Sequence, residues 1–285
     1  FSVYLDDLLI FLRKLQLGCY IGGWWFGPLG YANDLILLAP NREVLQAMLV
    51  VCQSYAREHN LVFSTDPVPA KSKTKCMYFC GRMGNVKYPA PVQLEGEDLP
   101  WVEKAEDLGH TLHQSVTMDK DCNRARANFI DRSVDVRQQF SFASPELTLQ
   151  MVQVLCSDGY GSMSWNLQSD SAESFFKSWN TCVKLVHGVP RSTFTYLVEG
   201  FLAKDQTSLR NQILSRYPGF YRKLKLSPSK EVRMLVKMVE NDPRSTTCQN
   251  LRYLRKVTNL ENAEQFSSWR IREVLPKKTV PEAEK

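Results

Sequence analysis

The sequence predicts an α+β protein in which a sheet-containing first part is followed by an all-helical second part. Short apolar runs beside Gly and Pro clusters, which are typical of β-hairpins, occur up to about residue 112. Beyond about residue 116 the apolar residues recur at helical spacing. The charge changes near the same place, since residues 1–120 carry 11 basic and 13 acidic side chains and residues 121–285 carry 25 and 17. We therefore expect a boundary near residues 113–118.

The first elements are predicted to be a helix and a hairpin. Tyr4–Leu8, which contains Asp6 and Asp7, has the pattern of a helix. The apolar runs Cys19–Phe26 and Tyr31–Ala39 are joined by Gly27–Gly30, and short apolar runs around a Gly/Pro cluster predict a hairpin. Pro40 then ends the second strand.

A helix is predicted from Asn41 to about His59. Asn is a favourable N-cap because its side-chain oxygen can accept a hydrogen bond from the first helical turn. The apolar residues that follow have the i, i+3, i+4, i+7 spacing of one buried face, and they are Leu45, Met48, Leu49, Cys52 and Tyr55.

Three further strand signals follow before the boundary. Lys75–Cys80 is predicted to be a strand. Val92–Leu94 and Leu99–Val102 flank a polar segment with one Gly, which predicts a second hairpin. Leu108–Leu112 is predicted to be another short strand.

The second part reads as a series of helices. Ser144 is an N-cap followed by Pro145 at the first helical position. A later helix ends at Gly188, and its apolar face is Phe175, Phe176, Trp179, Cys182, Val183 and Val186. Further helices are predicted over Asp205–Tyr217, Ser229–Glu240, Thr246–Val257 and Glu261–Arg272, with a frayed polar tail at Pro276–Lys285.

The composition argues against a membrane protein and for an intracellular one. The longest stretch without charge, Leu15–Asn33, holds five Gly and one Pro and does not suit a spanning helix. The eight cysteines are scattered without the spacing of a disulfide framework, which suits free thiols in the reducing cytoplasm or nucleus. Asp6 and Asp7 stand where a secretory signal would carry positive charge.

The most informative motif is Tyr31–Leu38, in which Asn33 and Asp34 stand at the head of an apolar strand. Mg²⁺ prefers oxygen ligands, and polymerases hold two such ions with carboxylates at a tight turn. Turns also favour Asn and Asp for purely local hydrogen bonding, so this motif alone is compatible with an ordinary turn.

Several motifs together give the chain a family resemblance. Phe1–Leu9, Tyr31–Leu38, the block Leu61–Met77 and Leu108–His110 follow one another in the order and spacing of polymerase palm motifs. In this respect the chain resembles the reverse transcriptases of non-LTR (LINE-type) retrotransposons. The resemblance implies a partial palm of antiparallel hairpins and helices over residues 1–115 and a thumb-like helical region over 116–190. A basic helical C-terminal region over 191–275 and a disordered tail over 276–285 would follow.

The resemblance also implies a chemistry and a set of site residues. It implies RNA-directed DNA synthesis, in which deoxynucleoside triphosphates are added to a DNA primer on an RNA template with Mg²⁺. Asp34 would be a catalytic metal ligand, with Asn33 at the neighbouring acid position. Lys73 would lie near the triphosphate, and Leu108, Gly109 and His110 would form the primer grip.

Two departures from the family pattern lead us to expect that this chain does not polymerise DNA by itself. Asn33 stands where the family has its first hairpin Asp, and an amide brings no negative charge. The family's other catalytic carboxylate would lie before Phe1. We do not assign Asp6 or Asp7 to replace it, because they belong to a helix. The alternative is a non-catalytic RNA- or DNA-binding remnant, or a relic with no selected activity.

Basic runs supply the candidate nucleic-acid contacts. Lys71 and Lys75 flank Lys73, and Arg252, Arg255 and Lys256 share one helix face at i, i+3, i+4 spacing. Each set has an alternative interpretation. The three lysines could instead protect a strand edge, and the basic helix face could be an ordinary solvated helix surface.

Cys76, Cys80, His110 and His113 have a spacing compatible with zinc, although the two cysteines lie in an apolar run where buried thiols are common.

Overall fold

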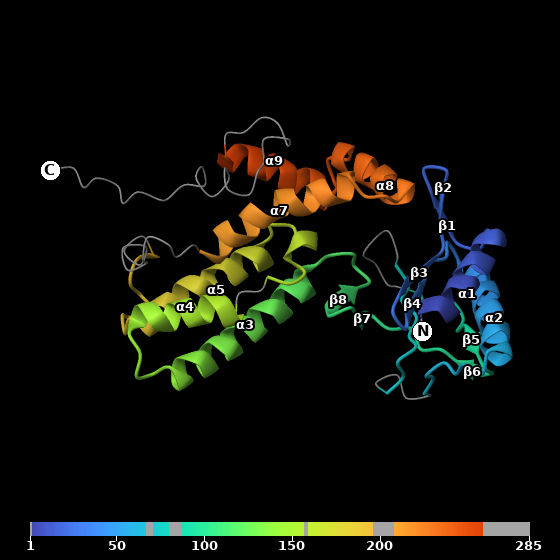
Figure 1. The fold of residues 1–285 in the computed structure, drawn as a ribbon, viewed down its shortest axis with the longest axis horizontal. Coiled ribbons are helices and arrows are strands. Elements are labelled where there is room, and N and C mark those ends of the chain that lie inside the picture. The colour runs from blue at the N-terminus through green and yellow to red at the C-terminus, as the bar shows by residue number, and fades with distance from the viewer. Residues whose placement is uncertain (1, 67–70, 80–86, 157–158, 196–207, 259–285) are drawn as a thin grey trace. The chain divides into compact units, whose positions relative to one another are not determined.

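A computed structural model describes residues 2–66, 71–79, 87–156, 159–195 and 208–258 (Figure 1). The chain divides into two compact units. The first comprises Phe1–Ala105 and His113–Val116, and the second comprises Glu106–Leu112 and Thr117–Lys285. The described residues form eight α-helices and four two-stranded antiparallel hairpins, which confirms the α+β class.

Two amphipathic helices form the core of the first unit. Helix α1 (Ser2–Lys14) buries Leu5, Leu8 and Leu12, and helix α2 (Arg42–Glu58) buries Met48 and Cys52 against them. The predicted cap of α2 is confirmed, because Asn41 accepts a hydrogen bond from the Val44 amide at 2.9 Å. The predicted helix at Tyr4–Leu8 is confirmed as part of α1.

The region between these helices forms two hairpins rather than the single one predicted. Strand β1 (Cys19–Ile21) pairs with β2 (Trp24–Phe26), and β3 (Pro28–Tyr31) pairs with β4 (Asp34–Leu37). The expected turn at Gly27–Gly30 is wrong, because Pro28 to Gly30 lie in β3.

Backbone geometry explains why the turns lie elsewhere. Gly22 and Gly23 both have positive φ, 57° and 80°, which suits a two-residue hairpin turn between β1 and β2. Gly27 has a different role, since a Cβ there would lie 2.3 Å from the Trp25 ring. Pro28 has the fixed φ that an edge strand tolerates.

A second cluster of apolar residues in the first unit joins α2 to the segments after it. Strands β5 (Gln93–Leu94) and β6 (Glu97–Asp98) form a hairpin close to the second one predicted, with Glu95 and Gly96 in its turn. The predicted second strand, Leu99–Val102, is wrong, because the chain turns earlier and Glu97–Asp98 pairs with β5. Gln46 of α2 holds β5 through two hydrogen bonds to the Gln93 backbone, 2.8 and 2.9 Å long. The buried members of the cluster are Leu49, Cys76, Val92, Leu94 and Leu99.

Two other strand predictions in this region are wrong. Within Lys75–Cys80, the described residues contribute only a single bridge, from Cys76 to Trp101, and Cys80 lies outside the described residues. Leu108–Leu112 is not one strand. Leu108 and Gly109, with φ of 45° and 77°, form the turn between β7 (Lys104–Asp107) and β8 (His110–His113).

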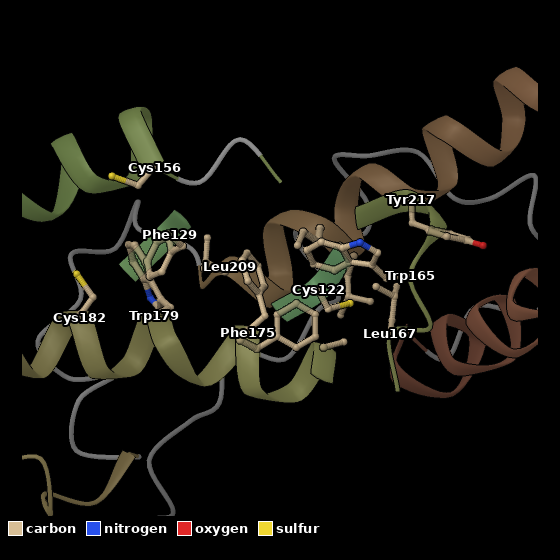
Figure 2. Close-up of a cluster of buried hydrophobic side chains, with 14 of the residues drawn as sticks. Cys122, Phe129, Cys156, Trp165, Leu167, Phe175, Trp179, Cys182, Leu209 and Tyr217 are labelled. Atoms are coloured by element: carbon tan, nitrogen blue, oxygen red, sulfur yellow. The ribbon is translucent and has the colours of Figure 1, made fainter. Parts of the chain in front are cut away.

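Three helices build most of the core of the second unit: α3 (Asp119–Gln139), α4 (Pro145–Cys156) and α5 (Asp170–Val186). A short 3-10 helix, η1, covers Ser162–Ser164. The predicted start of α4 is confirmed, since the Ser144 hydroxyl accepts from the Leu147 amide at 3.3 Å. The predicted apolar face of α5 is also confirmed, and Figure 2 shows Phe175, Trp179 and Cys182 pointing into the core.

Helices α7 (Leu209–Lys225), α8 (Lys230–Asn241) and α9 (Thr246–Thr258) complete the second unit. The last two match their predicted ranges within one residue. The prediction that a helix ends at Tyr217 is wrong, because α7 continues through Pro218. Burial of Tyr217, Pro218 and Tyr221 in the core offsets the hydrogen bond that Pro cannot make. Glu261–Arg272 and Pro276–Lys285 lie outside the described residues.

Candidate nucleic-acid interface

The turn between β3 and β4 presents Asn33 and Asp34 to solvent. Tyr31 pairs with Asp34 across the turn, so Ala32 and Asn33 are its two central residues. Ala32 has a φ of 52°, and a positive φ at only the first central residue is the pattern of a type II′ turn. Because Ala has a Cβ, this conformation stores about 1–3 kcal/mol of strain at the tip that carries Asn33 and Asp34.

The donors at this tip do not fit a two-Mg²⁺ centre. Asp34 supplies one carboxylate, and the Asn33 amide oxygen supplies a neutral ligand that cannot balance the charge of a second ion. Asp6 and Asp7 are exposed on α1. Within the described ranges, no group of three or more His, Cys, Asp or Glu side chains could hold a metal ion.

The described residues do not form the zinc site that the spacing allowed. Cys76 is buried in the cluster beneath α2, where burial raises the pKa of its thiol to about 11.

The lysines near the expected triphosphate position are exposed on a segment between α2 and β5. Lys71, Lys73 and Lys75 are exposed, whereas the intervening Ser72 is buried. The Thr74 amide donates to the Ser64 carbonyl at 3.1 Å, which fixes the middle of the segment. Three ammonium groups therefore face solvent at every second residue. They belong to the first unit, as Asp34 does, whereas Leu108–His110 belongs to the second.

The expected primer grip is a hairpin turn fastened to the second unit. The Tyr160 hydroxyl donates to the Leu108 carbonyl at 2.6 Å, and the His110 ring stacks on the Tyr160 ring with centroids 5.0 Å apart. Gly161 lies directly beneath His110, where a Cβ would approach the imidazole to 2.6 Å. The turn is therefore held rigidly from below.

A buried carboxylate provides the main anchor of this turn. The Asp121 side chain is fully buried at the start of α3. It accepts hydrogen bonds from the Thr111 amide at 3.0 Å, the Arg124 guanidinium at 2.7 Å and the Trp165 indole at 2.8 Å. The His110 Nδ1 lies 3.5 Å away.

The environment of Asp121 favours its ionised form. Burial by itself raises the pKa of this carboxyl, but the hydrogen bonds from Arg124, Thr111 and Trp165 outweigh burial and lower the pKa below its usual value. The anchor is therefore a charged group at neutral pH, and it joins strand β8, helix α3 and the segment at Trp165.

Helices α7–α9 carry the strongest positive charge of the described chain. Residues 208–258 contain twelve Lys and Arg against three Asp and Glu. On α9 the basic residues Arg252, Arg255 and Lys256 are exposed, while Leu251 and Leu254 of the same helix are buried. We call these three residues the α9 basic face.

Each of the three acids of this region has a local partner. Glu240 pairs with Lys225 at 3.4 Å, Asp242 pairs with Arg244 at 3.2 Å, and Glu231 accepts from the Ser229 hydroxyl at 2.8 Å. The α9 basic face is also held in place, because the buried Asn250 bonds to the backbone of Trp165 and Leu167 at 2.8 and 3.0 Å.

Sequence reasoning did not identify Asp121, Arg124, Tyr160 or Trp165. An acid in the first turn of a helix is an ordinary feature, since it interacts favourably with the helix dipole. Its role as an anchor depends on contacts with Thr111 and Trp165, which lie 10 and 44 residues away. No local pattern carries that information.

Comparison with known family models and with curated proteins finds no match to this chain. Within the described ranges, no helix is both long enough and apolar enough to span a membrane.

Proposed function

We propose that this chain derives from a reverse transcriptase of the non-LTR retrotransposon type and that it binds nucleic acid rather than copying it. The observation that carries the lineage is the β3–β4 turn, where Tyr31–Asp34 forms a strained two-residue turn with Asn33 and Asp34 exposed at its tip. A strained turn that exposes polar residues is typical of a functional site.

The single carboxylate at this turn argues against catalysis by this chain. A two-metal mechanism needs ligands that balance the charge of both ions. Asn33 removes one negative charge from the place where the family carries an acid. Loss of a group that organises the reacting ions costs orders of magnitude in rate, so we expect no measurable polymerisation.

Primer extension tests this part of the proposal. The purified chain would be given an RNA template, a DNA primer, deoxynucleoside triphosphates and Mg²⁺, with Asn33→Asp and Asp34→Asn assayed beside it. We expect no incorporation by the unmodified chain. Incorporation that Asp34→Asn abolishes would show that the chain is an active polymerase. Any activity that appears only in Asn33→Asp would support the lineage.

The observation that favours nucleic-acid binding is the α9 basic face. Three cations on one helix face can follow a phosphate backbone, and the acids of the region each have a local partner. The ligand class is RNA or an RNA–DNA hybrid, as the lineage implies.

Salt-dependent binding tests this second part. Fluorescence anisotropy would compare the chain with the triple variant Arg252→Gln, Arg255→Gln and Lys256→Gln on a labelled RNA strand and on an RNA–DNA hybrid. Each phosphate contact contributes about 0.7 to the slope of log affinity against log salt for a single strand, so the variant should lower the slope by about two.

A matched variant controls for the loss of net charge. Lys230→Gln, Lys237→Gln and Arg244→Gln remove three charges from α8 and the segment after it, and we expect a smaller change in slope. Equal slopes for the unmodified chain and the α9 variant would contradict the proposal.

A further inference from the structure

The exposed face of helix α1 has acids at one end and bases at the other. The buried face of α1, formed by Leu5, Leu8 and Leu12, belongs to the core that α1 shares with α2 (Figure 1). The opposite face carries the exposed residues Asp6, Asp7, Ile10, Phe11, Arg13 and Lys14. The two acids come first along the helix, the two apolar residues follow, and the two bases come last.

The middle of this face is apolar. Ile10 and Phe11 are 44% and 49% exposed, although both residue types are usually buried. Single exposed apolar residues are common on protein surfaces, but these two are adjacent and have charged residues on both sides along the helix. An apolar centre with a polar rim is typical of a protein–protein interface.

The charges are placed symmetrically about Ile10. Asp6 and Lys14 lie four residues before and after it. Asp7 and Arg13 lie three residues before and after it. If two α1 helices pair antiparallel around a two-fold axis at Ile10, each acid of one copy therefore lies opposite a base of the other. A two-fold interface must be self-complementary, and this face meets that condition.

The helix dipole does not account for this pattern. Acids near the start of a helix and bases near its end are stabilising, but the effect falls off within the first and last turns. The first turn of α1 contains no acid, because Asp6 and Asp7 lie in the second turn. The dipole also gives no reason for the exposure of Ile10 and Phe11. A second copy of the chain accounts for both the acids and the apolar centre.

We propose that the chain forms a two-fold dimer in which the exposed faces of two α1 helices pack antiparallel. Asp6 of each copy pairs with Lys14 of the other, and Asp7 pairs with Arg13, around an apolar centre at Ile10. An arginine has five N–H donors, so Arg13 can contact its own chain and the second copy together. The inference is separate from the proposed function, because α1 carries none of the proposed nucleic-acid contacts.

The length of α1 limits the strength of the dimer. A helix of 13 residues is about 20 Å long, so a contact along one of its faces lies at the small end of protein interfaces. Such a dimer should dissociate on dilution.

Sedimentation equilibrium of the full chain at increasing concentration tests the inference. The protein is first treated with nuclease, so that a shared nucleic-acid strand cannot link two copies. We expect the average mass to rise from that of a monomer to that of a dimer. A chain that stays monomeric, or that assembles without passing through a dimer, overturns the inference.

Ile10→Glu tests the centre of the interface. It sets two carboxylates against each other on the two-fold axis and should weaken dimerisation at least about tenfold, because central residues carry most of the binding energy. Val50→Glu is the matched control. Val50 is 53% exposed on α2 and lies on the opposite side of that helix from Met48 and Cys52, which pack with α1. It should leave dimerisation unchanged. Equal effects of the two substitutions overturn the inference.

Charge reversal tests the pairing without changing Ile10. The variant Asp6→Lys, Asp7→Lys carries only bases on this face, and the variant Arg13→Glu, Lys14→Glu carries only acids. Each should dimerise poorly alone, because like charges then meet across the interface. An equimolar mixture should dimerise, since every base faces an acid of the other copy. Mixing would not repair a folding defect. A mixture that stays monomeric while the unmodified chain dimerises overturns the inference.

Exchange within one pair tests the register. Asp6→Lys alone, or Lys14→Asp alone, sets like charges opposite each other in both symmetry-related pairs, and each should weaken the dimer. The double variant Asp6→Lys, Lys14→Asp again places an acid opposite a base and should dimerise as the unmodified chain does. A double variant that dimerises no better than the single variants overturns the register about Ile10.

Discussion

At the scale of single residues, the site depends on groups whose role is set by what surrounds them. The proposed role of Asn33 comes from its place in a sequence motif, and Asn33 lies exposed in the β3–β4 turn. Asp121 could not be identified in this way. Its three hydrogen-bond donors come from separate segments, and only the folded chain brings Thr111, Arg124 and Trp165 together.

The strain at Ala32 gives a first prediction. Gly adopts a positive φ without steric cost, so Ala32→Gly should stabilise the first unit by about 1 kcal/mol. Ala32→Val should have the opposite effect, because a β-branched residue is a severe outlier at this φ. Thermal melting of the three chains measures both changes. A lower melting temperature for Ala32→Gly would mean that the turn is not strained.

The anchor of the β7–β8 turn gives a second prediction. Asp121→Asn leaves the Arg124 guanidinium beside a neutral group and weakens a buried network, which should lower the free energy of unfolding by about 3 kcal/mol. Asp119→Asn is the matched control, since Asp119 also lies in the first turn of α3 but is not fully buried. It should cost less than about 1 kcal/mol. Urea denaturation measures both.

The pH dependence of the same substitution follows from the lowered pKa of Asp121. A lowered pKa in the folded state means that the ionised carboxylate stabilises the fold. This contribution is complete above the ordinary Asp pKa of about 4 and is lost as the pH falls through the lowered value. The difference between the unmodified chain and Asp121→Asn should therefore be constant near neutral pH and shrink in acid. A difference that grows in acid would contradict this sign.

At the scale of elements, helices were predictable where caps and periodicity agreed, and hairpins were less so. Asn41, Ser144 and Gly188 mark helix ends through local chemistry, and each lies where the sequence indicates. The hairpin turns were misplaced because Gly27–Gly30 looks like a turn in isolation. Gly27 is needed because a Cβ there would meet the Trp25 ring and the Leu17 carbonyl, to which the Trp25 indole donates across eight residues.

The cap of α2 supplies a prediction at this scale. Asn41→Ala removes the acceptor for the Val44 amide and should lower the free energy of unfolding of the first unit by about 1 kcal/mol. Asn41→Asp keeps an acceptor at the same place and should cost little. Chemical denaturation followed by circular dichroism measures the two. If both substitutions cost the same, the side-chain cap is not what stabilises the start of α2.

At the scale of the whole molecule, the charge division read from the sequence falls close to the division of the fold. The basic surplus belongs to residues after 120, and the second unit holds α7–α9 with the α9 basic face. The motifs on which the proposed lineage rests lie mostly in the first unit. The contact between Phe129 of α3 and Phe175 of α5 could not be predicted, because each alone is an ordinary core residue.

The last prediction follows from the presence of separate cores. The α1–α2 cluster is built from residues of the first unit, and the α3–α5 core from residues of the second. Units with their own cores can unfold as separate cooperative steps. We therefore expect two transitions in urea, with Asn41→Ala shifting one and Asp121→Asn shifting the other. Far-ultraviolet circular dichroism and tryptophan fluorescence follow both, because Trp24 lies in the first unit and Trp165 in the second. If both substitutions shift a single common transition, the two cores unfold as one. Asp121→Asn would then also destabilise the hairpin that carries Asp34.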